Sequence, residues 1–328
     1  MSIFRRALGA ALLATGLAAP AMAQNAPSAF PGTRPVTIVV AWAPGGSTDF
    51  VGRVLAQAMS ATLGGSVVVD NRPGASGTVG HASVARARPD GYTLLLGVNS
   101  TYAMSRHLFP QRGYDDDTAF APIGRVAQSP IFFCTNPQTG VTDLAGLVAR
   151  AKAQPGRMSY GSSGAGSSAH LATEMFLRDA DIRVENVTYR GGAPAVQALI
   201  TNEVQMAMVD GPTALPLIAA NSIRCLAVST LERNPLAPQI PTFDESGFRG
   251  FQATSDFALL APAGTPAEII ARLEAAMRAA MANPETLERL RNGAIVPTVG
   301  TAAEFPAYMR AESQKWADVI RQRNITLE

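Results

Sequence analysis

Four turns rich in glycine and hydroxyl side chains stand where predicted strands give way to predicted helices. They are residues 44–49 (PGGSTD), 161–168 (GSSGAGSS), 190–194 (RGGAP) and 210–213 (DGPT). In parallel sheets such turns lie at the carboxyl ends of the strands, where ligands bind. The first turn of a helix also presents unpaired N–H groups and the positive end of the helix dipole, which attract anions. One such turn is usually a plain helix cap, but their repetition in both halves of the chain predicts an anion site.

Hydroxyl groups in two of these turns can add direct hydrogen-bond donors. They belong to Ser47, Thr48, Ser162, Ser163, Ser167 and Ser168. Because these turns offer main-chain amides and hydroxyls and need no buried Lys or Arg to form an anion site, the anion that fits best is a carboxylate. Asp49 and Asp210 are suited to orient an amino or hydroxyl group of a ligand, although an Asp after a glycine turn is also a common helix cap. His170 follows the second turn, and the sequence leaves open whether it faces a ligand or bonds to the neighbouring main chain.

The second turn comes close to two enzyme motifs, but in each case a residue that the motif requires is missing. Residues 164–169 fit the dinucleotide fingerprint G-x-G-x-x-A, but no acidic residue closes the strand at 187–189, where the ribose partner is expected. Residues 161–165 carry Ala165 where the nucleophile elbow G-x-S-x-G needs its second glycine. The sequence therefore predicts no catalytic residue and no cofactor.

Metal-ligand spacing is also missing from the sequence. His81, His107 and His170 lie far apart, outside any H-E-x-x-H pattern. The three aspartates at 115–117 form too short a series for a calcium loop, and we expect them in a solvated loop. No metal site is predicted.

The elements that must position these turns alternate along the chain. The predicted strands are 36–40, 67–69, 92–98, 131–135, 158–160, 184–189, 204–209, 225–229 and 257–260. Helical patterns follow at 50–63, with Ser47 or Thr48 as its N-cap, around 77–86, and at 266–281. Strands that alternate with helices at these spacings predict parallel βαβ units, with helices on both faces of the sheet.

The first 23 residues resemble a secretory signal peptide. Arg5 and Arg6 supply the positive start, residues 7–19 are apolar, and residues 21–23 (AMA) form a cleavage site. An uncleaved membrane anchor is the alternative, but about 13 apolar residues fall short of the roughly 20 that span a bilayer. We therefore expect an exported protein that begins at Gln24, with an extended segment over residues 24–33.

Charge excludes one large class of partners. The chain has 27 Lys and Arg against 25 Asp and Glu, and Arg5 and Arg6 belong to the predicted signal peptide, which holds no acidic residue. The mature chain is therefore close to neutral. Nucleic-acid binding needs clustered positive charge, so nucleic acid is not expected as a partner. With 47% hydrophobic residues, the chain can fill one large core or two ordinary ones.

Cys134 and Cys225 are the two cysteines of the sequence, and both lie in apolar, strand-like runs. An exported protein can form disulfides, but a free Cys also serves as a small buried hydrophobe. The sequence leaves both alternatives open, because it does not show whether the two residues come within bridging distance.

Over nearly the whole mature chain, the residues resemble a known family. The chain is similar to the periplasmic solute-binding proteins of tripartite tricarboxylate transporters, the TctC or Bug family. Seven ordered signatures carry this resemblance: PGGSTD at 44–49 with Arg53, NRPGA at 71–75, PDGYTLL at 89–95, YGSSG at 160–164 with HL at 170–171, YRG at 189–191 with APA at 193–195, PTF at 241–243 with Glu245 and Gly247, and APAGTP at 261–266.

The resemblance implies an α/β fold of the type II-like periplasmic binding protein class. Two lobes, each a mixed, mostly parallel sheet flanked by helices, would be joined by crossing strands and would close on a ligand like a flytrap. We expect one discontinuous lobe from residues 34–127 and 232–328, and the other from residues 128–231.

The resemblance also implies a carboxylated ligand held by main-chain amides and hydroxyls of both lobes. Carried over residue by residue, the expected contacts are Ser47, Thr48, Asp49, Asn99, Ser163, Ala165, Gly166, Ser167, Gly192 and Asp210. Two positions depart from the family pattern. Asp256 stands where the family commonly has Trp, which leaves the local packing in question, and Cys134 ends a strand that is usually more aliphatic.

The function implied is capture of a small organic carboxylate and its delivery to the membrane subunits of a tripartite tricarboxylate transporter, by a monomer without enzymatic activity. Two alternatives stay open. The same closure could signal to a membrane kinase, and the sequence does not separate transport from sensing. An exported enzyme acting on a carboxylate is disfavoured by the failed motifs, and turnover of the ligand would reveal it.

Overall fold

The computed structural model describes residues 30–109 and 111–326. The predicted signal peptide, residues 1–23, lies outside the described residues, as does most of the segment 24–33. Residues 31–328 belong to one unit of the chain. Its strands form two sheets that share one long strand, and these are called sheet A and sheet B below.

Sheet A contains the first three predicted strands. β1 (Val36–Val40) lies between β2 (Val67–Asn71) and β3 (Thr93–Val98), and all three are parallel. Two antiparallel strands extend this sheet in the order β2-β1-β3-β9-β4, and a short strand pairs with β4. These additions are β9 (Thr254–Pro262), β4 (Phe120–Thr135) and β10 (Val296–Pro297).

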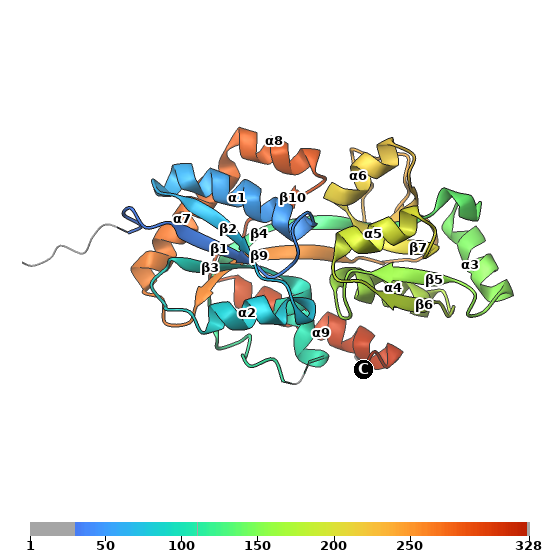
Figure 1. Ribbon diagram of the computed structural model, residues 1–328, viewed down its shortest axis with the longest axis horizontal. Coiled ribbons are helices and arrows are strands. Elements are labelled where there is room, and N and C mark those ends of the chain that lie inside the picture. Colours follow the sequence, from blue (N-terminus) through green and yellow to red (C-terminus); the bar gives the residue numbers. More distant parts are fainter. Residues whose placement is uncertain (1–29, 110, 327–328) are drawn as a thin grey trace, which may run out of the picture. The chain divides into compact units, whose positions relative to one another are not determined.

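Sheet B is built on the far end of β4. Residues 120–130 of β4 pair with β9, and residues 131–135 pair with β7 on one side and β8 on the other. Three strands parallel to one another continue from there in the order β7-β5-β6. The strands are β5 (Ser159–Ser162), β6 (Glu185–Thr188), β7 (Met206–Asp210) and β8 (Arg224–Val228). β4 and β9 thus run from one sheet toward the other (Figure 1).

Helices cover both faces of sheet A, because alternate strand residues point to opposite faces. Gly52 of α1 lies against Val40 and Leu96, whereas Val39 and Leu95 pack with helix α2 on the other face. The helices of this half are α1 (Ser47–Leu63), α2 (Thr78–Ala85), α7 (Ala267–Ala282) and α8 (Pro284–Asn292).

Sheet B is covered in the same way. Phe133 packs in a core with Leu171 of α4, and its neighbour Phe132 packs in a second core with Leu199 of α5. The helices are α3 (Leu144–Ala153), α4 (Ser168–Asp179), α5 (Gly192–Ile200) and α6 (Gly211–Ala219). Short helical turns occur at Ala75–Gly77, Ser100–Met104, Ser105–His107 and Pro137–Thr139.

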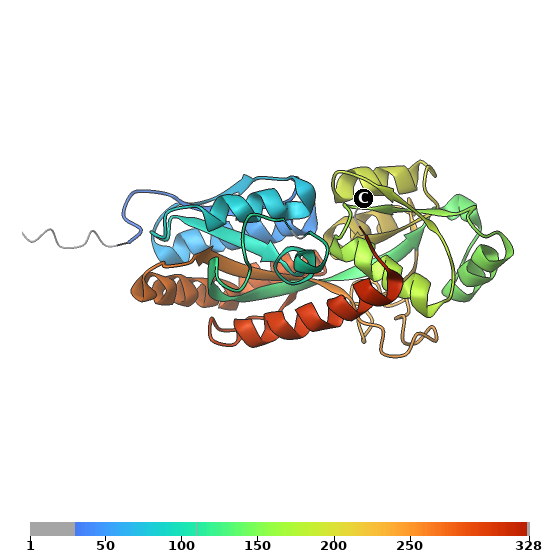
Figure 2. The same cartoon turned by 90° about the horizontal axis from the view of Figure 1, so that it is seen from below.

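Helix α9 (Phe305–Arg323) contributes to the cores of both sheets. Phe305 and Met309 pack in the core beneath sheet A, and Trp316 and Val319 pack in the core that holds α4. Figure 2 shows this helix running along one side of both sheets. The residues after 232 therefore support both halves of the fold, and the two-lobe boundaries stay a prediction.

The two cysteines lie opposite each other on neighbouring antiparallel strands. Cys134 of β4 faces Cys225 of β8, and their sulfur atoms are bonded. Of the two alternatives left open by the sequence, the structure contains the disulfide. Within the described ranges, no helix combines the length and the apolar character needed to cross a membrane.

Candidate ligand-binding site

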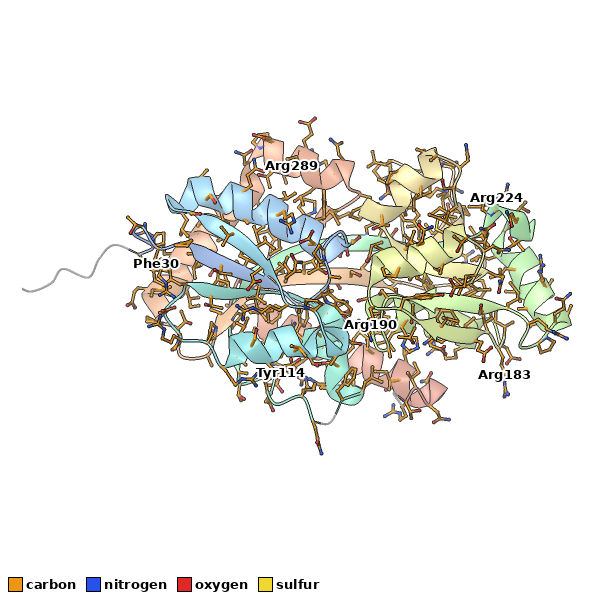
Figure 3. The ribbon with its side chains drawn as sticks, in the orientation of Figure 1. Phe30, Tyr114, Arg183, Arg190, Arg224 and Arg289 are labelled. Carbon is orange, nitrogen blue, oxygen red and sulfur yellow. A yellow bond between two sulfur atoms is a disulfide. The ribbon has the colours of Figure 1, made fainter. Side chains whose placement is uncertain are left out.

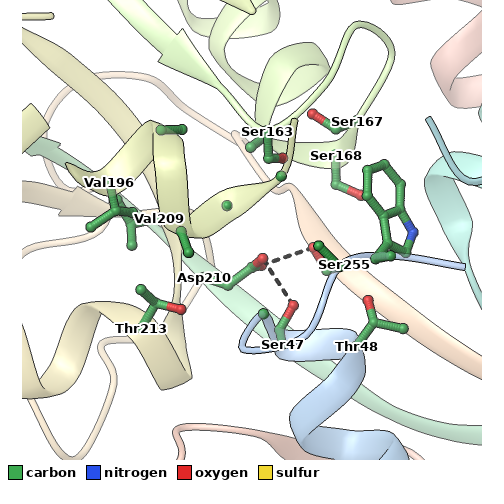
Figure 4. Close-up of a pocket in the computed structure, with 18 of the residues that line it drawn as sticks. Ser47, Thr48, Ser163, Ser167, Ser168, Val196, Val209, Asp210, Thr213 and Ser255 are labelled. Carbon is green, nitrogen blue, oxygen red and sulfur yellow. Dashed lines mark hydrogen bonds between the residues drawn. The ribbon is translucent and has the colours of Figure 1, made fainter. Parts of the chain in front are cut away.

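The four turns singled out in the sequence meet at one cavity of about 140 Å³. They follow β1, β5, β6 and β7, and the helices α1, α4, α5 and α6 begin from them. Figure 4 shows the cavity with its polar side chains turned inward from several of these segments. Strands of both sheets thus bring their carboxyl ends to the same place, as expected for a ligand site in an α/β fold.

Three of the four helices start at the cavity without a side-chain cap. The N-caps are Gly46 for α1, Gly191 for α5 and Asp210 for α6, and none of their side chains caps the helix. The prediction of Ser47 or Thr48 as the N-cap of α1 was wrong, because the helix already begins at Ser47. These helix ends keep main-chain N–H groups for an anion.

Six of the ten predicted contact residues line the cavity: Ser47, Thr48, Ser163, Ser167, Gly192 and Asp210. Of these, Ser167 also caps α4, because its Oγ accepts a hydrogen bond from the main-chain N–H of His170 at 3.2 Å. The other four predicted residues, Asp49, Asn99, Ala165 and Gly166, are not among the residues that line the cavity. Contact of any of the ten with a ligand stays a prediction.

Asp49 holds the turn before α1 in place. Its carboxylate accepts hydrogen bonds from the Gly45 N–H at 3.1 Å, Arg53 Nε at 3.0 Å and Asn71 Nδ2 at 3.0 Å. Burial raises the pKa of this carboxyl, but the hydrogen bonds from Arg53, Gly45 and Asn71 together lower it by more. The pKa is therefore below its ordinary value. Asp49 is therefore an ionised group that stabilises the glycine turn from behind.

Asn99 is fully buried and connects several segments around the cavity. Its Oδ1 accepts a hydrogen bond from Ser168 Oγ at 3.0 Å, and its Nδ2 donates to the main-chain oxygen of Thr254 at 2.9 Å and to Asp256 Oδ2 at 3.2 Å. Asn99 thus positions Ser168, which does line the cavity.

Asp256, the departure from the family pattern, is satisfied by polar partners. Besides the contact with Asn99, its Oδ2 accepts a hydrogen bond from Tyr308 OH at 2.6 Å, and its Oδ1 accepts one from Thr254 Oγ1 at 3.0 Å. Burial raises the pKa of this carboxyl. The residue is 4% exposed and is absent from the cavity wall, so it acts in packing between β9 and α9.

The loop before α4 is fixed by Ala165, Gly166 and His170. Ser76 Oγ donates to the main-chain oxygen of Ala165 at 2.6 Å, and the Gly166 N–H donates to His170 Nδ1 at 2.9 Å. Gly166 has φ 77°, a conformation that glycine adopts without strain. Burial lowers the pKa of His170. Of the two roles that the sequence left open for this residue, the structure shows the bond to the neighbouring main chain.

Asp210 is the acidic group inside the cavity. Its Oδ2 accepts a hydrogen bond from Ser47 Oγ at 2.9 Å and its Oδ1 accepts one from Ser255 Oγ at 2.9 Å, as the dashed lines in Figure 4 show. Burial raises the pKa of this carboxyl, and the two hydroxyls lower it in part. Arg190, labelled in Figure 3, also lines the cavity, but its side chain is exposed.

Several cavity residues were missed by the sequence reasoning. Trp42 lies two residues after the end of β1, and Val209 is the last residue but one of β7, so the rule that ligands meet strand ends could have found both. Ser255 also lines the cavity, but it lies on β9, far from any glycine turn, so no pattern in the sequence marks it. Among the described residues, no group of three or more His, Cys, Asp or Glu side chains could hold a metal ion.

A cavity at the carboxyl ends of strands from two sheets, lined by uncapped helix ends, hydroxyls, apolar side chains and the half-buried Asp210, is the kind of site that binds a small molecule. The sequence profile of the tripartite tricarboxylate transporter family receptor, TctC, matches residues 51–325. The chain belongs to this family.

Similar proteins span nearly the whole chain. Protein BugT of Bordetella pertussis is 33% identical over 98% of this chain and 97% of its own length. A solved structure of R. palustris Rpa4515 with adipate has a TM-score of 0.87 at 34% identity, covering 90% of this chain and 99% of that one. MatC from Rhodopseudomonas palustris, with bound malate, has a TM-score of 0.83 at 30% identity, covering 89% and 100%. The predicted fold class is confirmed.

Proposed function

We propose that this protein is a periplasmic solute-binding protein that captures a small organic carboxylate in the cavity and delivers it to a tripartite tricarboxylate-type membrane transporter. The observation that carries the proposal is the set of helix N-termini without a side-chain cap, those of α1, α5 and α6, which begin at one cavity. Main-chain N–H groups at such ends bind anions without a cationic side chain. The adipate and malate bound to the two related structures are carboxylates of this kind.

The predicted lobes, residues 34–127 with 232–328 and residues 128–231, would close around the ligand. Several hydrogen bonds cross between these lobes at the cavity. They include Ser47 Oγ to Asp210 Oδ2, Ser255 Oγ to Asp210 Oδ1, Ser76 Oγ to the main-chain oxygen of Ala165, and Ser168 Oγ to Asn99 Oδ1. A ligand that adds contacts to both lobes would favour this closed arrangement over an open one.

Export follows from the predicted signal peptide, and delivery to the transporter follows from membership of the family. Under this proposal the protein takes up its ligand without changing it. A bound carboxylate should therefore be recovered chemically intact after long incubation.

Thermal unfolding with a panel of mono- and dicarboxylates, each paired with its amide or ester, tests the ligand class. At 100 times the dissociation constant, a ligand stabilises the folded state by about 2.7 kcal/mol and should raise the melting temperature by about 5 to 10 °C. The amides and esters should have no effect. A panel in which no carboxylate gives a shift, while sugars or cations do, would refute the proposal.

A proline substitution tests the role of the main-chain amides. Gly192 is the first residue of α5 and lines the cavity, so Gly192→Pro removes one N–H at a position where helices tolerate proline. We expect at least a tenfold loss of affinity for the carboxylate. Ala267→Pro makes the same change at the first residue of α7, away from the cavity, and should leave affinity unchanged.

A further inference from the structure

Asp210 stands at a helix N-cap position but does not cap its helix. Three other α-helices of the described chain have an N-cap residue of a capping type, Asp143, Ser167 and Asn283, and in each the side chain accepts a hydrogen bond from a main-chain N–H of its own helix. Asp210 makes no such bond. Its carboxylate instead lines the cavity.

Two hydroxyls fix the carboxylate in that orientation. Ser47 from α1 and Ser255 from β9 donate to different oxygens of Asp210, each at 2.9 Å. An ionised carboxylate can accept about four hydrogen bonds. Two remain to be filled, and the groups that can reach them are those of a ligand or water in the cavity.

No cationic side chain forms an ion pair with Asp210 in the part of the chain that the structure describes. By contrast, Asp49, in the turn before α1, is paired with Arg53 at 2.9 Å. The two hydroxyls use only part of the acceptor capacity of this half-buried carboxylate of Asp210, and the acceptors that stay unfilled cost free energy where water is excluded. A ligand that brings its own donor would meet this requirement.

We propose that Asp210 makes the cavity selective for carboxylates that also carry a hydrogen-bond donor, a hydroxyl or an ammonium group, over analogues with a methylene at that place. The inference rests on the proposed carboxylate-binding function and names the ligand class more closely. The ligand's carboxylate would lie at the uncapped helix ends and its donor at Asp210. Val98, Val196 and Val209, which also line the cavity, would contact the carbon chain between them.

Isothermal titration calorimetry with matched ligand pairs tests this selectivity. The pairs are malate and succinate, aspartate and succinate, and 3-hydroxybutyrate and butyrate. In at least one pair, the parent protein should bind the donor-bearing member at least tenfold more tightly, because a site built to bond a ligand's hydroxyl or amino group is left with an unpaired polar group by the analogue. The hydroxyl and ammonium pairs identify which donor is used.

Variants assign the selectivity to Asp210. Asp210→Asn keeps the shape and one acceptor but removes the charge, so a preference for ammonium should fall at least tenfold and a preference for hydroxyl should fall less. Asp210→Ala should abolish either preference. Asp143→Asn makes the same change at an Asp N-cap outside the cavity and should leave the preference as in the parent.

The measured quantity is the ratio of two affinities in one protein, which a purely structural role of Asp210 would not change. If the parent binds carboxylates but binds both members of every pair equally, or prefers the analogue without a donor, this inference is wrong and the proposed function stands. If no carboxylate binds, the proposed function fails.

If Asp210→Ala does not fold, Asp210→Asn decides. An unchanged affinity ratio in Asp210→Asn for an ammonium ligand overturns the inference for that donor.

Discussion

His81 should make the protein lose stability in mild acid. The side chain lies in α2 and is fully buried, and neither ring nitrogen has a hydrogen-bond partner. The imidazole packs between aromatic rings, with centroid distances of 5.7 Å to both Tyr114 and Phe120. Burial, with a smaller contribution from the charge of Arg112, lowers the pKa of His81 to about 3.

The size of the effect follows from the two pKa values. In the unfolded chain His81 titrates near its ordinary value of about 6.5, so between pH 6.5 and pH 3 only the unfolded state binds the proton. The stabilising contribution is complete above pH 6.5 and decreases as the pH falls. Between pH 7 and pH 5 the free energy of unfolding should therefore drop by about 2 kcal/mol through this residue alone.

Urea unfolding of the parent and of His81→Leu at pH 7 and pH 5 measures this contribution. Leu fills a similar volume and does not titrate, so the variant should lose about 2 kcal/mol less than the parent between the two pH values. The carboxylates of the protein titrate in both chains and cancel in this difference. Equal losses in parent and variant would show that His81 is not a buried neutral imidazole.

Three further experiments test the residues that support the cavity and the disulfide. Asp49→Ala removes the acceptor that holds the first glycine turn and should cost about 1 to 3 kcal/mol of stability, seen in urea unfolding, together with carboxylate affinity seen by calorimetry. Gly166→Ala places a side chain at φ 77° and should weaken binding, whereas the control Gly156→Ala, at φ 71° outside the cavity, should cost similar stability, about 1 kcal/mol, and leave affinity unchanged. Replacing both Cys134 and Cys225, which are 91 residues apart, by Ala should lower the unfolding free energy by about 4 to 5 kcal/mol if chain entropy dominates, and a reducing agent should then have no effect on the variant.

The positions of the cavity turns were predictable because their signals are local. A short apolar run, a glycine turn and a helical pattern are read from adjacent residues, and each predicted turn that precedes a helix was found at the cavity. Residues 120–130 of β4 were missed because the prediction relied on such local signals. They include Pro122, Gly124 and Pro130, which argue against a strand, and the ladder with β9 shifts register near the first two of these residues.

Burial of polar groups was harder to predict, because it depends on distant partners. Asp256 stands where the resemblance led us to expect a Trp, and it is nevertheless buried, since Tyr308, 52 residues later, donates to its carboxylate. Asn99 was expected at the ligand, and its partners Ser168 and Thr254 are 69 and 155 residues away. Only the fold shows that these groups bond to one another.

Asp49 and Asp210 show how far the sequence can separate a residue that supports a turn from one that lines the cavity. Both are acidic residues beside a glycine turn, and the sequence assigned both to the ligand. Asp49 has its cation on the same helix face, since Arg53 follows four residues later, and this spacing was visible in the sequence. Asp210 has no such neighbour, and the hydroxyls that hold it, Ser47 and Ser255, are 163 and 45 residues away. An acidic residue with a basic residue at i+4 should therefore have been assigned to support of the turn, and the acidic residue without one to the cavity wall.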